Sequence, residues 1–129
     1  MDSNLDKLES MVGHHFLDSK LLDRALTHRS FSAFNNERLE FLGDSVLGVI
    51  VSAILYSLYT DSEEGELTRM RAQIVKKNTL AQIARRLQLG DHLKLGGSAA
   101  KGGGTENDSI LADALEALIG AVYLDAGLE

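Results

Sequence analysis

The sequence predicts an all-α protein, and three observations support this fold class. Proline is absent from the 129 residues, and the alternation of β-branched residues that is typical of strands is scarce. Apolar residues instead recur with the 3.6-residue period of a helix along most of the chain. With 44% hydrophobic and 25% charged residues, the chain is expected to form one globular domain over residues 1–129.

Two short helices are expected near the N-terminus. The first carries Leu5, Leu8 and Val12 at helical spacing and ends at Gly13. The second begins at residues 18–19, an Asp-Ser pair suited to a helix N-terminus, and continues to about residue 26.

The third helix is expected to be the longest, from a cap at Asn35 or Asn36 to about residue 59. From residue 46 to residue 56 its only polar groups are Ser52 and the Tyr56 hydroxyl, and apolar residues fall on every side. This pattern predicts a helix that is buried all round. The apolar run is too short to span a bilayer, so no membrane partner is expected.

Two more helices should follow a break at residues 60–62. The first begins near Glu63 and Glu64, because acidic residues are favourable at a helix N-terminus. The second runs from residues 78–79 to Gly90.

The remaining sequence predicts a loop and a final helix. Residues 95–104 are rich in glycine, and ordering them is costly in entropy, so we expect a flexible loop that is mobile or shaped by a ligand. Asp108 and Ser109 are then expected to cap the last helix, which ends at Gly127.

Two of these helices each carry a pair of acids one turn apart. Glu40 and Asp44 are four residues apart, and Asp113 and Glu116 are three apart. Because a helix turns about 100° per residue, each pair lies on one face. Asp113 and Glu116 are the only charges from residue 110 to residue 124. Each helix therefore offers two carboxylates in apolar surroundings.

Such carboxylates need a positive partner. Two like charges ~4 Å apart repel by roughly 4 kcal/mol at an effective dielectric of ~20, and desolvation adds several kcal/mol for each ion. Basic side chains, shared protons or divalent cations could compensate, and neither helix places a Lys or Arg on its acidic face. Oxygen ligands select Mg²⁺ or Mn²⁺, and the chain has no Cys and no His at a zinc spacing. We interpret the acids as a metal site; the alternative is a solvated acidic edge.

Composition sets few further limits on function. The acidic, polar N-terminus lacks the features of a signal peptide, so a cytoplasmic location is expected. The absence of cysteine excludes disulfides and a thiol site. A net charge of −6 would disfavour a nucleic-acid partner. Because four of the 19 acidic residues belong to the proposed metal site, however, the charge is neutral evidence.

Four stretches of the chain resemble the catalytic domain of the ribonuclease III family in its bacterial form. The signature is residues 36–47, NERLEFLGDSVL. Residues 25–30, ALTHRS, precede it, and residues 64–72, EGELTRMRA, follow it. Residues 108–121, DSILADALEALIGA, complete the set. The four stretches occur in the order of the family and cover nearly the whole chain.

The resemblance implies a function. It implies an all-helical, homodimeric endonuclease that hydrolyses double-stranded RNA with Mg²⁺, for which Mn²⁺ can substitute. The products would have 5′-phosphate and 3′-hydroxyl ends with short 3′ overhangs. The expected substrates are precursors of rRNA and mRNA.

The resemblance also assigns roles to residues. It implies that Glu37 and Glu64 are further acids near the cleavage site. It implies that Phe41 lodges in a pocket of the partner subunit. The acids that match the metal-binding carboxylates of the family are Glu40, Asp44, Asp113 and Glu116.

Double-stranded RNA is recognised through its shape, its phosphates and its 2′-hydroxyls. The candidates for phosphate contact, each of which could equally be a solvated surface residue, are Arg69, Arg71, Lys76, Lys77 and Lys101. Arg85 and Arg86 are expected to be plain surface.

The histidines are not expected to be catalytic. His28 is expected to pack and form hydrogen bonds rather than to act as a catalytic base, and His14 and His15 are expected to be structural.

The chain departs from the usual pattern of the family, and two of the departures bear on function. Glu106 and Asn107 stand where many bacterial relatives have two basic residues, which should weaken phosphate attraction there. Such enzymes usually continue into another helix, a linker and a double-stranded-RNA-binding domain, whereas this sequence stops at Glu129. It is therefore either a catalytic fragment or a natural protein without that module, and the abrupt end favours a fragment.

Two other functions compete with this interpretation. A non-catalytic ribonuclease III-like scaffold would typically lack one or more of the four acids. A helical di-metal nucleotide pyrophosphohydrolase also uses clustered Glu and Asp, but at a different spacing. A His-Asp phosphohydrolase is disfavoured because the chain has no His-Asp dipeptide.

Overall fold

The computed structural model describes residues 3–127, and its regular elements are all helices, which confirms the all-α prediction. Within these residues, strand-type pairing is limited to one isolated bridge between Thr27 and Lys94. The helices are α1 (Ser3–Val12), α2 (Ser19–Ala25), α3 (Glu37–Leu58), α4 (Glu64–Val75), α5 (Lys77–Arg86), η1 (Leu89–His92), α6 (Gly97–Lys101), η2 (Gly104–Glu106) and α7 (Asp108–Ala126).

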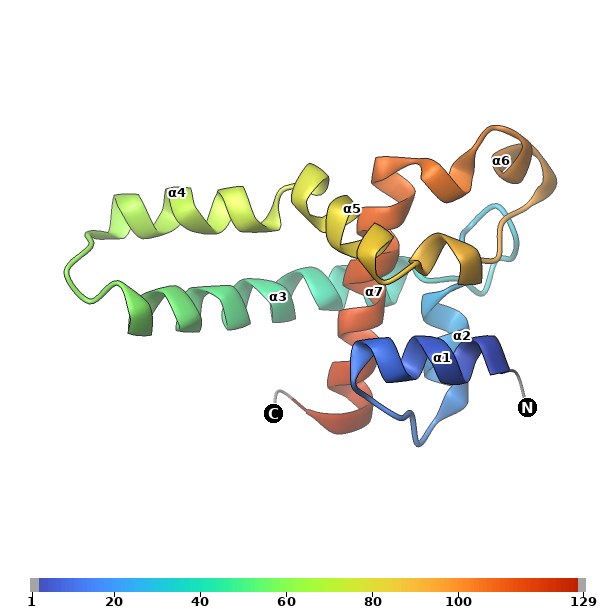
Figure 1. Ribbon diagram of the computed structural model, residues 1–129, viewed down its shortest axis with the longest axis horizontal. Helices are drawn as coiled ribbons and strands as arrows, with labels where there is room; N and C mark the ends of the chain where they lie inside the picture. The colour runs from blue at the N-terminus through green and yellow to red at the C-terminus, as the bar shows by residue number, and fades with distance from the viewer. Residues whose placement is uncertain (1–2, 128–129) are drawn as a thin grey trace.

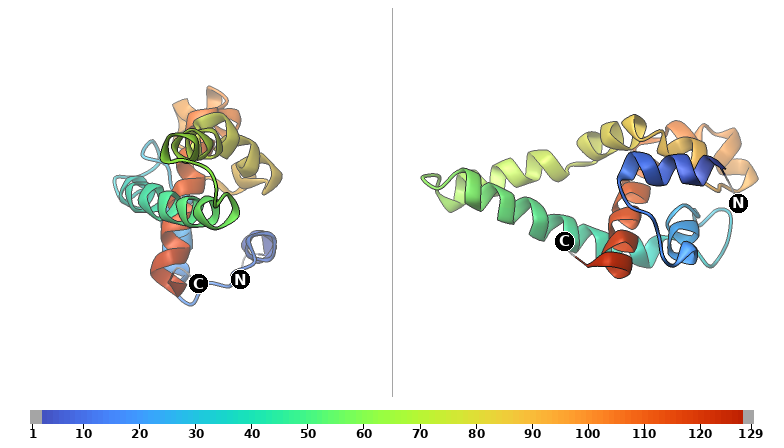
Figure 2. Two further views of the ribbon diagram at one scale, coloured as in Figure 1. Left: turned by 90° about the vertical axis from the view of Figure 1, so that its left-hand side faces the viewer. Right: turned by 60° about the horizontal axis from the view of Figure 1, so that its bottom comes forward.

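Helix α7 is the centre of the fold. It crosses α3 and packs against α5 and α2 (Figure 1). Helices α3 and α4 run antiparallel and project together from the body as an arm, which is visible from a second direction in Figure 2. The buried core lies around α7, and its largest fully buried side chains are Leu8, Leu26, Leu89 and Leu111.

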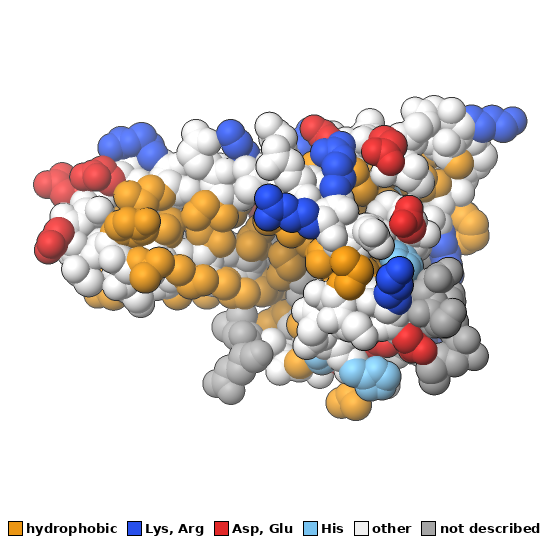
Figure 3. Space-filling view, viewed as in Figure 1, with side chains coloured by type: hydrophobic (Ala, Val, Ile, Leu, Met, Phe, Trp, Pro, Cys, Tyr) orange, Lys and Arg blue, Asp and Glu red, His pale blue; other side chains and the backbone are white. Residues whose placement is uncertain are grey.

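The prediction that α3 is buried all round is wrong for this chain. Val46, Val51 and Leu55 are buried, but Ile54 and Tyr56 are exposed, Tyr56 at 76%. The outer half of α3 leaves the body and is covered on one side by α4, so hydrophobic side chains line the arm (Figure 3). By length and composition α3 could also cross a membrane, a property that it shares with core helices of soluble proteins.

Asparagines cap two of the helices. The Asn35 Oδ1 atom accepts a hydrogen bond from the Glu37 amide of α3 at 3.0 Å. The buried Asn36 instead donates from its side chain to the Ala25 carbonyl at 3.1 Å. At α7 the cap is Asn107, whose side chain accepts from the Ile110 amide. The predicted cap at residues 108–109 is therefore wrong by one position, because these residues already belong to the helix.

Helix α5 ends earlier than predicted. It stops at Arg86, and Gln88 adopts a left-handed conformation with φ of 57°, which turns the chain out of the helix. Gly90 does not end α5 but allows a close contact: a Cβ atom there would lie 2.6 Å from the Thr105 carbonyl oxygen.

The glycine-rich stretch is also more ordered than predicted. Residues 97–101 form α6, and residues 104–106 form η2. Gly104 is buried, and a Cβ atom there would lie 2.7 Å from the Ala99 carbonyl oxygen. In this stretch glycine allows tight packing of two short helices, so the prediction of a loop is wrong for residues 97–101 and 104–106, and mobility of the stretch stays a prediction.

Polar contacts hold neighbouring segments onto both ends of α7. Asp125 accepts hydrogen bonds from the His14 Nε2 atom at 2.7 Å and the Leu17 amide at 3.0 Å, which ties the α1–α2 connection to the end of α7 and confirms a structural role for His14. These hydrogen bonds lower the pKa of Asp125, and the one from the Leu17 amide has the largest effect. Arg85 pairs with Asp108 at the other end of α7, so it is not the plain surface residue that was predicted.

Candidate metal centre

The acids predicted from the sequence converge where α3 crosses α7. Carboxylate oxygens of Glu40, Asp113 and Glu116 all lie within 4.8 Å of one another. Asp44 lies outside this group of three, but it is near enough to Glu116 to accept a hydrogen bond from the protonated Glu116 carboxyl group. A protonated Glu40 can donate to Asp113 in the same way. Each acid of α3 thus has a neighbouring acid on α7.

Two glycines bring the helices close enough for these contacts. A Cβ atom on Gly43 would lie 1.6 Å from the Glu116 carbonyl oxygen, and one on Gly120 would lie 2.4 Å from the Leu39 carbonyl oxygen. The backbones of α3 and α7 therefore touch at both positions. Sequence reasoning did not single out these glycines. The sequence did contain a signal for this contact, because each glycine lies inside a helix with a strong apolar pattern. A glycine there destabilises the helix by about 1 kcal/mol relative to alanine, and close packing against another helix is a common reason for it.

The crowded carboxylates resist ionisation. Burial raises the pKa of Glu40 to about 7, with further contributions from Asp113, Glu37 and Asp44. Burial and the hydrogen bond with Asp44 raise the pKa of Glu116 to about 8. The ion pairs found within residues 3–127 involve other acids, so no Lys or Arg neutralises this cluster there.

This arrangement fits a divalent cation. Three oxygen donors meet at one point, a hard cation prefers oxygen ligands, and no basic side chain from the described residues competes for the position. Glu40, Asp113 and Glu116 could each supply a ligand directly, and Asp44 lies beside them, next to Glu116. Their role as ligands stays a prediction.

The two further acids occupy different places. Glu37 is exposed in the first turn of α3, at 4.0 Å from Arg29, and it contributes to the raised pKa of Glu40. Glu64 is the first residue of α4, and α4 begins at the end of the arm remote from α7 (Figure 1). The structure therefore brings Glu37 to the edge of the cluster but does not bring Glu64 there within one chain.

The basic candidates for phosphate contact all lie on the surface. Arg71 also donates a hydrogen bond to the Ser52 Oγ atom at 2.9 Å, which connects α4 to α3. In Figure 3 basic side chains are spread along the α4 side of the arm and the body. Contact with RNA stays a prediction for the exposed residues Arg69, Arg71, Lys76, Lys77 and Lys101.

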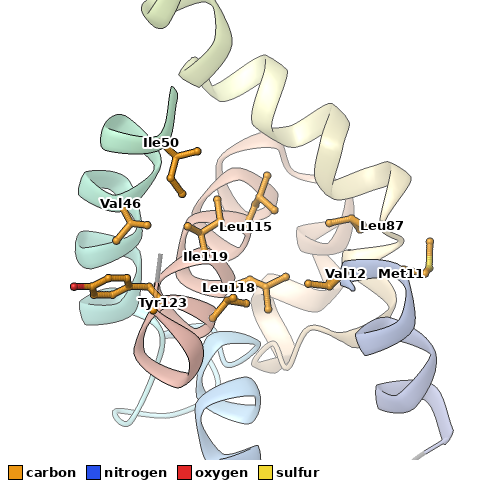
Figure 4. Close-up of a pocket in the computed structure, with 11 residues that line it drawn as sticks. Met11, Val12, Val46, Ile50, Leu87, Leu115, Leu118, Ile119 and Tyr123 are labelled. Atoms are coloured by element: carbon orange, nitrogen blue, oxygen red, sulfur yellow. The ribbon is translucent and has the colours of Figure 1, made fainter. Parts of the chain in front are cut away.

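The apolar cavity of the body is separate from the acids. It has a volume of about 310 Å³ and lies between α1, α3 and α7 (Figure 4). Val46, Leu115 and Ile119 line it, and among the lining residues that the structure describes Tyr123 alone has a titratable side chain. The side chains that could take part in acid, base or metal chemistry therefore lie in the acid cluster rather than in this cavity.

Comparison with known proteins identifies relatives along the whole chain. The family model described as Ribonuclease-III-like matches residues 18–129. The chain is 55% identical over 125 residues to Ribonuclease 3 of Histophilus somni, covering 97% of this chain and 56% of that protein. It is 59% identical over 123 residues to Ribonuclease 3 of Delftia acidovorans, covering 95% of this chain and 54% of that protein. The chain thus spans about half the length of the curated relatives that it matches.

Solved structures agree with this relationship. A nuclease domain of ribonuclease III from Campylobacter jejuni, studied for flexibility in a region involved in dimer formation, superposes with a TM-score of 0.95. The two sequences are 46% identical over 96% of this chain and 87% of that chain. Dicer from Pichia stipitis is more distant, with a TM-score of 0.69 and 35% identity over 88% of this chain and 48% of that chain.

Replacement of Gly43 by alanine should separate α3 from α7. Because the new methyl group would overlap the Glu116 carbonyl oxygen, we expect a loss of about 2–3 kcal/mol in the free energy of unfolding. Chemical denaturation would measure this. Gly48→Ala is the matched control on the same helix, because a Cβ atom there meets nothing within 4 Å. Equal stability of the two variants would contradict the close contact.

The raised pKa values of Glu40 and Glu116 predict how stability depends on pH without divalent ions. Between their ordinary pKa of 4.5 and about 8, the folded chain binds more protons than the unfolded chain, so stability should fall as pH rises. Millimolar Mg²⁺ should raise the melting temperature above pH 8, where the acids are ionised. It should have little effect near pH 4.5, where they are protonated.

Thermal unfolding at several pH values, with and without Mg²⁺, would measure this dependence. Glu116→Gln should flatten the pH profile and reduce the stabilisation by Mg²⁺. Glu66→Gln, at an exposed position of α4, is the control. A wild-type melting temperature that rises with pH in the absence of metal would refute the prediction.

Proposed function

The chain belongs to the ribonuclease-III-like family, and on that premise we propose that residues 1–129 form the catalytic domain of an endonuclease that cuts double-stranded RNA. The observation that carries this proposal is the meeting of Glu40, Asp113 and Glu116 at the crossing of two helices. All four acids that match the metal-binding carboxylates of the family by resemblance are present, which argues against a non-catalytic scaffold.

The proposed reaction is hydrolysis of a phosphodiester bond with Mg²⁺, or with Mn²⁺ in its place. Divalent ions held by these acids would activate a water molecule and stabilise charge on the leaving 3′ oxygen. The chain's own contribution is to hold carboxylate oxygens in fixed positions on two packed helices, so that little reorganisation is needed. The proposed products have 5′-phosphate and 3′-hydroxyl ends with short 3′ overhangs.

We also propose that the chain acts as a homodimer. Phe41 is a large apolar side chain that is 79% exposed, and Ile54 and Tyr56 in the outer half of α3 are exposed as well. A hollow of about 750 Å³ lies beside Phe41, lined in part by Leu39, Leu42 and Leu124. In a two-fold dimer each Phe41 can enter the hollow of the other chain, because both partners present the same surface.

The proposed substrate is a long RNA duplex. A-form RNA presents its phosphates and 2′-hydroxyls across a wide minor groove, so recognition depends on shape and charge. The exposed basic residues of α4 and of the α4–α5 junction would contact phosphates on either side of the acids. We place this activity in the cytoplasm, in the processing of rRNA and mRNA precursors.

Replacement of Glu116 by glutamine should abolish cleavage while duplex binding persists. The change keeps the shape of the side chain but removes a charge that holds the cation, so kcat should fall by about 10³-fold. Cleavage of a long RNA duplex, with and without Mg²⁺ and with the product ends mapped, would test this together with the activity itself. Binding would be followed by fluorescence anisotropy.

Glu66→Gln serves again as the control and should cleave normally. Cleavage by Glu116→Gln at the wild-type rate would refute the proposed role of the acids. Hydrolysis of nucleoside triphosphates without cleavage of duplex RNA would instead favour a pyrophosphohydrolase.

Replacement of Phe41 by alanine should weaken the dimer. Loss of a large aromatic side chain at the centre of an interface typically costs about 2 kcal/mol or more, which corresponds to a Kd raised about 30-fold. Sedimentation equilibrium would measure it. Phe31→Ala removes an aromatic side chain that is 56% exposed in the loop before α3, and it is the matched control. Identical association of Phe41→Ala and wild type would count against this interface.

A further inference from the structure

The loop between α2 and α3 holds His28 beside the acid cluster. On one side the Thr27 carbonyl oxygen accepts a hydrogen bond from the Asn36 amide at 2.9 Å. On the other side the His28 amide donates to the Lys94 carbonyl oxygen at 3.0 Å. The Asn36 carbonyl oxygen in turn accepts from the Glu40 amide at 2.8 Å. His28 is therefore fixed next to the helical turn that carries Glu40.

Hydrogen bonds also determine which ring nitrogen of His28 carries the proton. The Ser30 amide donates to the His28 Nδ1 atom at 3.1 Å. The Ser30 Oγ atom lies 2.7 Å from the same nitrogen, and it accepts a hydrogen bond from the Gly96 amide at 2.8 Å. An amide can only donate, so Nδ1 is an acceptor and the ring proton is on Nε2.

Gly96 allows this arrangement. A Cβ atom at this position would lie 2.1 Å from the Ser30 carbonyl oxygen, so only glycine permits the two loops to approach this closely. The His28 orientation therefore depends on a segment that is distant in the sequence. These contacts confirm that His28 forms hydrogen bonds, as expected from the sequence. They involve only the Nδ1 atom of the ring.

The Nε2 atom of His28 has no partner among the described residues and remains accessible to solvent. Every hydrogen bond found for its ring involves Nδ1. Within residues 3–127 no buried side-chain nitrogen lacks a partner, and His28 is only partly buried, so Nε2 must reach the surface. Burial and the Arg29 charge lower the pKa of His28, while Asp113 and Glu37 act in the opposite direction. The ring is thus a neutral N–H donor in the electrostatic field of the cluster.

We propose that the His28 Nε2–H group donates a hydrogen bond to a non-bridging phosphate oxygen of the RNA strand bound at the acid cluster. This inference rests on the proposed function. A phosphodiester placed there meets several carboxylates, which repel it, so a donor at the edge of the cluster is needed. Arg29 already lies 4.0 Å from Glu37 at this edge, and His28 adds a neutral donor that brings no further positive charge toward Asp113 to compete with a cation.

Replacement of His28 by alanine should lower kcat/KM for cleavage of duplex RNA. Loss of one hydrogen bond to a charged group predicts a decrease of about 10- to 100-fold, with the melting temperature little changed. His28→Gln should recover part of the activity, since its amide can donate from a similar position. His15→Ala is the control, because the His15 side chain is 78% exposed and lies on the α1–α2 connection.

A second measurement separates this inference from the proposed function. Nitrogen-15 NMR of the Glu116→Gln chain should show the Nε2–H tautomer of His28, and a short RNA duplex should shift the Nε2 resonance. A histidine with a purely structural role would keep its resonance. If the wild-type chain fails to cleave duplex RNA, the proposed function fails, and the NMR result alone decides the role of His28.

Three outcomes would overturn the inference. The first is an Nδ1–H tautomer in the free chain. The second is an Nε2 resonance that stays unchanged when the RNA duplex is saturating. The third is wild-type cleavage kinetics in a folded His28→Ala variant.

Discussion

The direct contact between the backbones of α3 and α7 is the constraint on which the rest of the structure depends. Gly43 and Gly120 leave no room for side chains between the helices, so each helix meets carbonyl oxygens of the other. This closeness fixes the separation of Glu40 from Asp113 and Glu116. A wider crossing, which is the usual result when larger side chains separate two helices, would spread the carboxylates apart.

The site is built at the expense of stability. Burial and mutual repulsion disfavour ionisation of Glu40 and Glu116, as their raised pKa values show. A cation bound there would neutralise the acids and remove this penalty, so that cation binding would stabilise the fold. The close crossing of α3 and α7 holds the acids together, and the loop at His28 adds a neutral donor at the edge of the cluster. The crossing helices α3 and α7 thus supply the negative charges, and a separate loop supplies the neutral donor.

Local periodicity and residue chemistry determined much of this protein from the sequence alone. The 3.6-residue repeat of apolar residues located the long helices, because hydrogen bonds within a helix join residues only four positions apart. The same repeat showed that Glu40 and Asp44 share a face, as do Asp113 and Glu116. Charge in an apolar setting then indicated that these acids had a function, since burial of an unpaired carboxylate is costly.

Only the tertiary structure decided how these local features combine. The contact of Gly43 with α7, the order of residues 97–101 and the hydrogen bond from Gly96 to Ser30 each join segments through packing rather than through the helical repeat. The exposure of α3 was missed for the same reason: an apolar repeat shows that a surface needs a partner but not which partner covers it. Distances between helices depend on the shapes of surfaces far apart in the chain, and a local pattern cannot contain them.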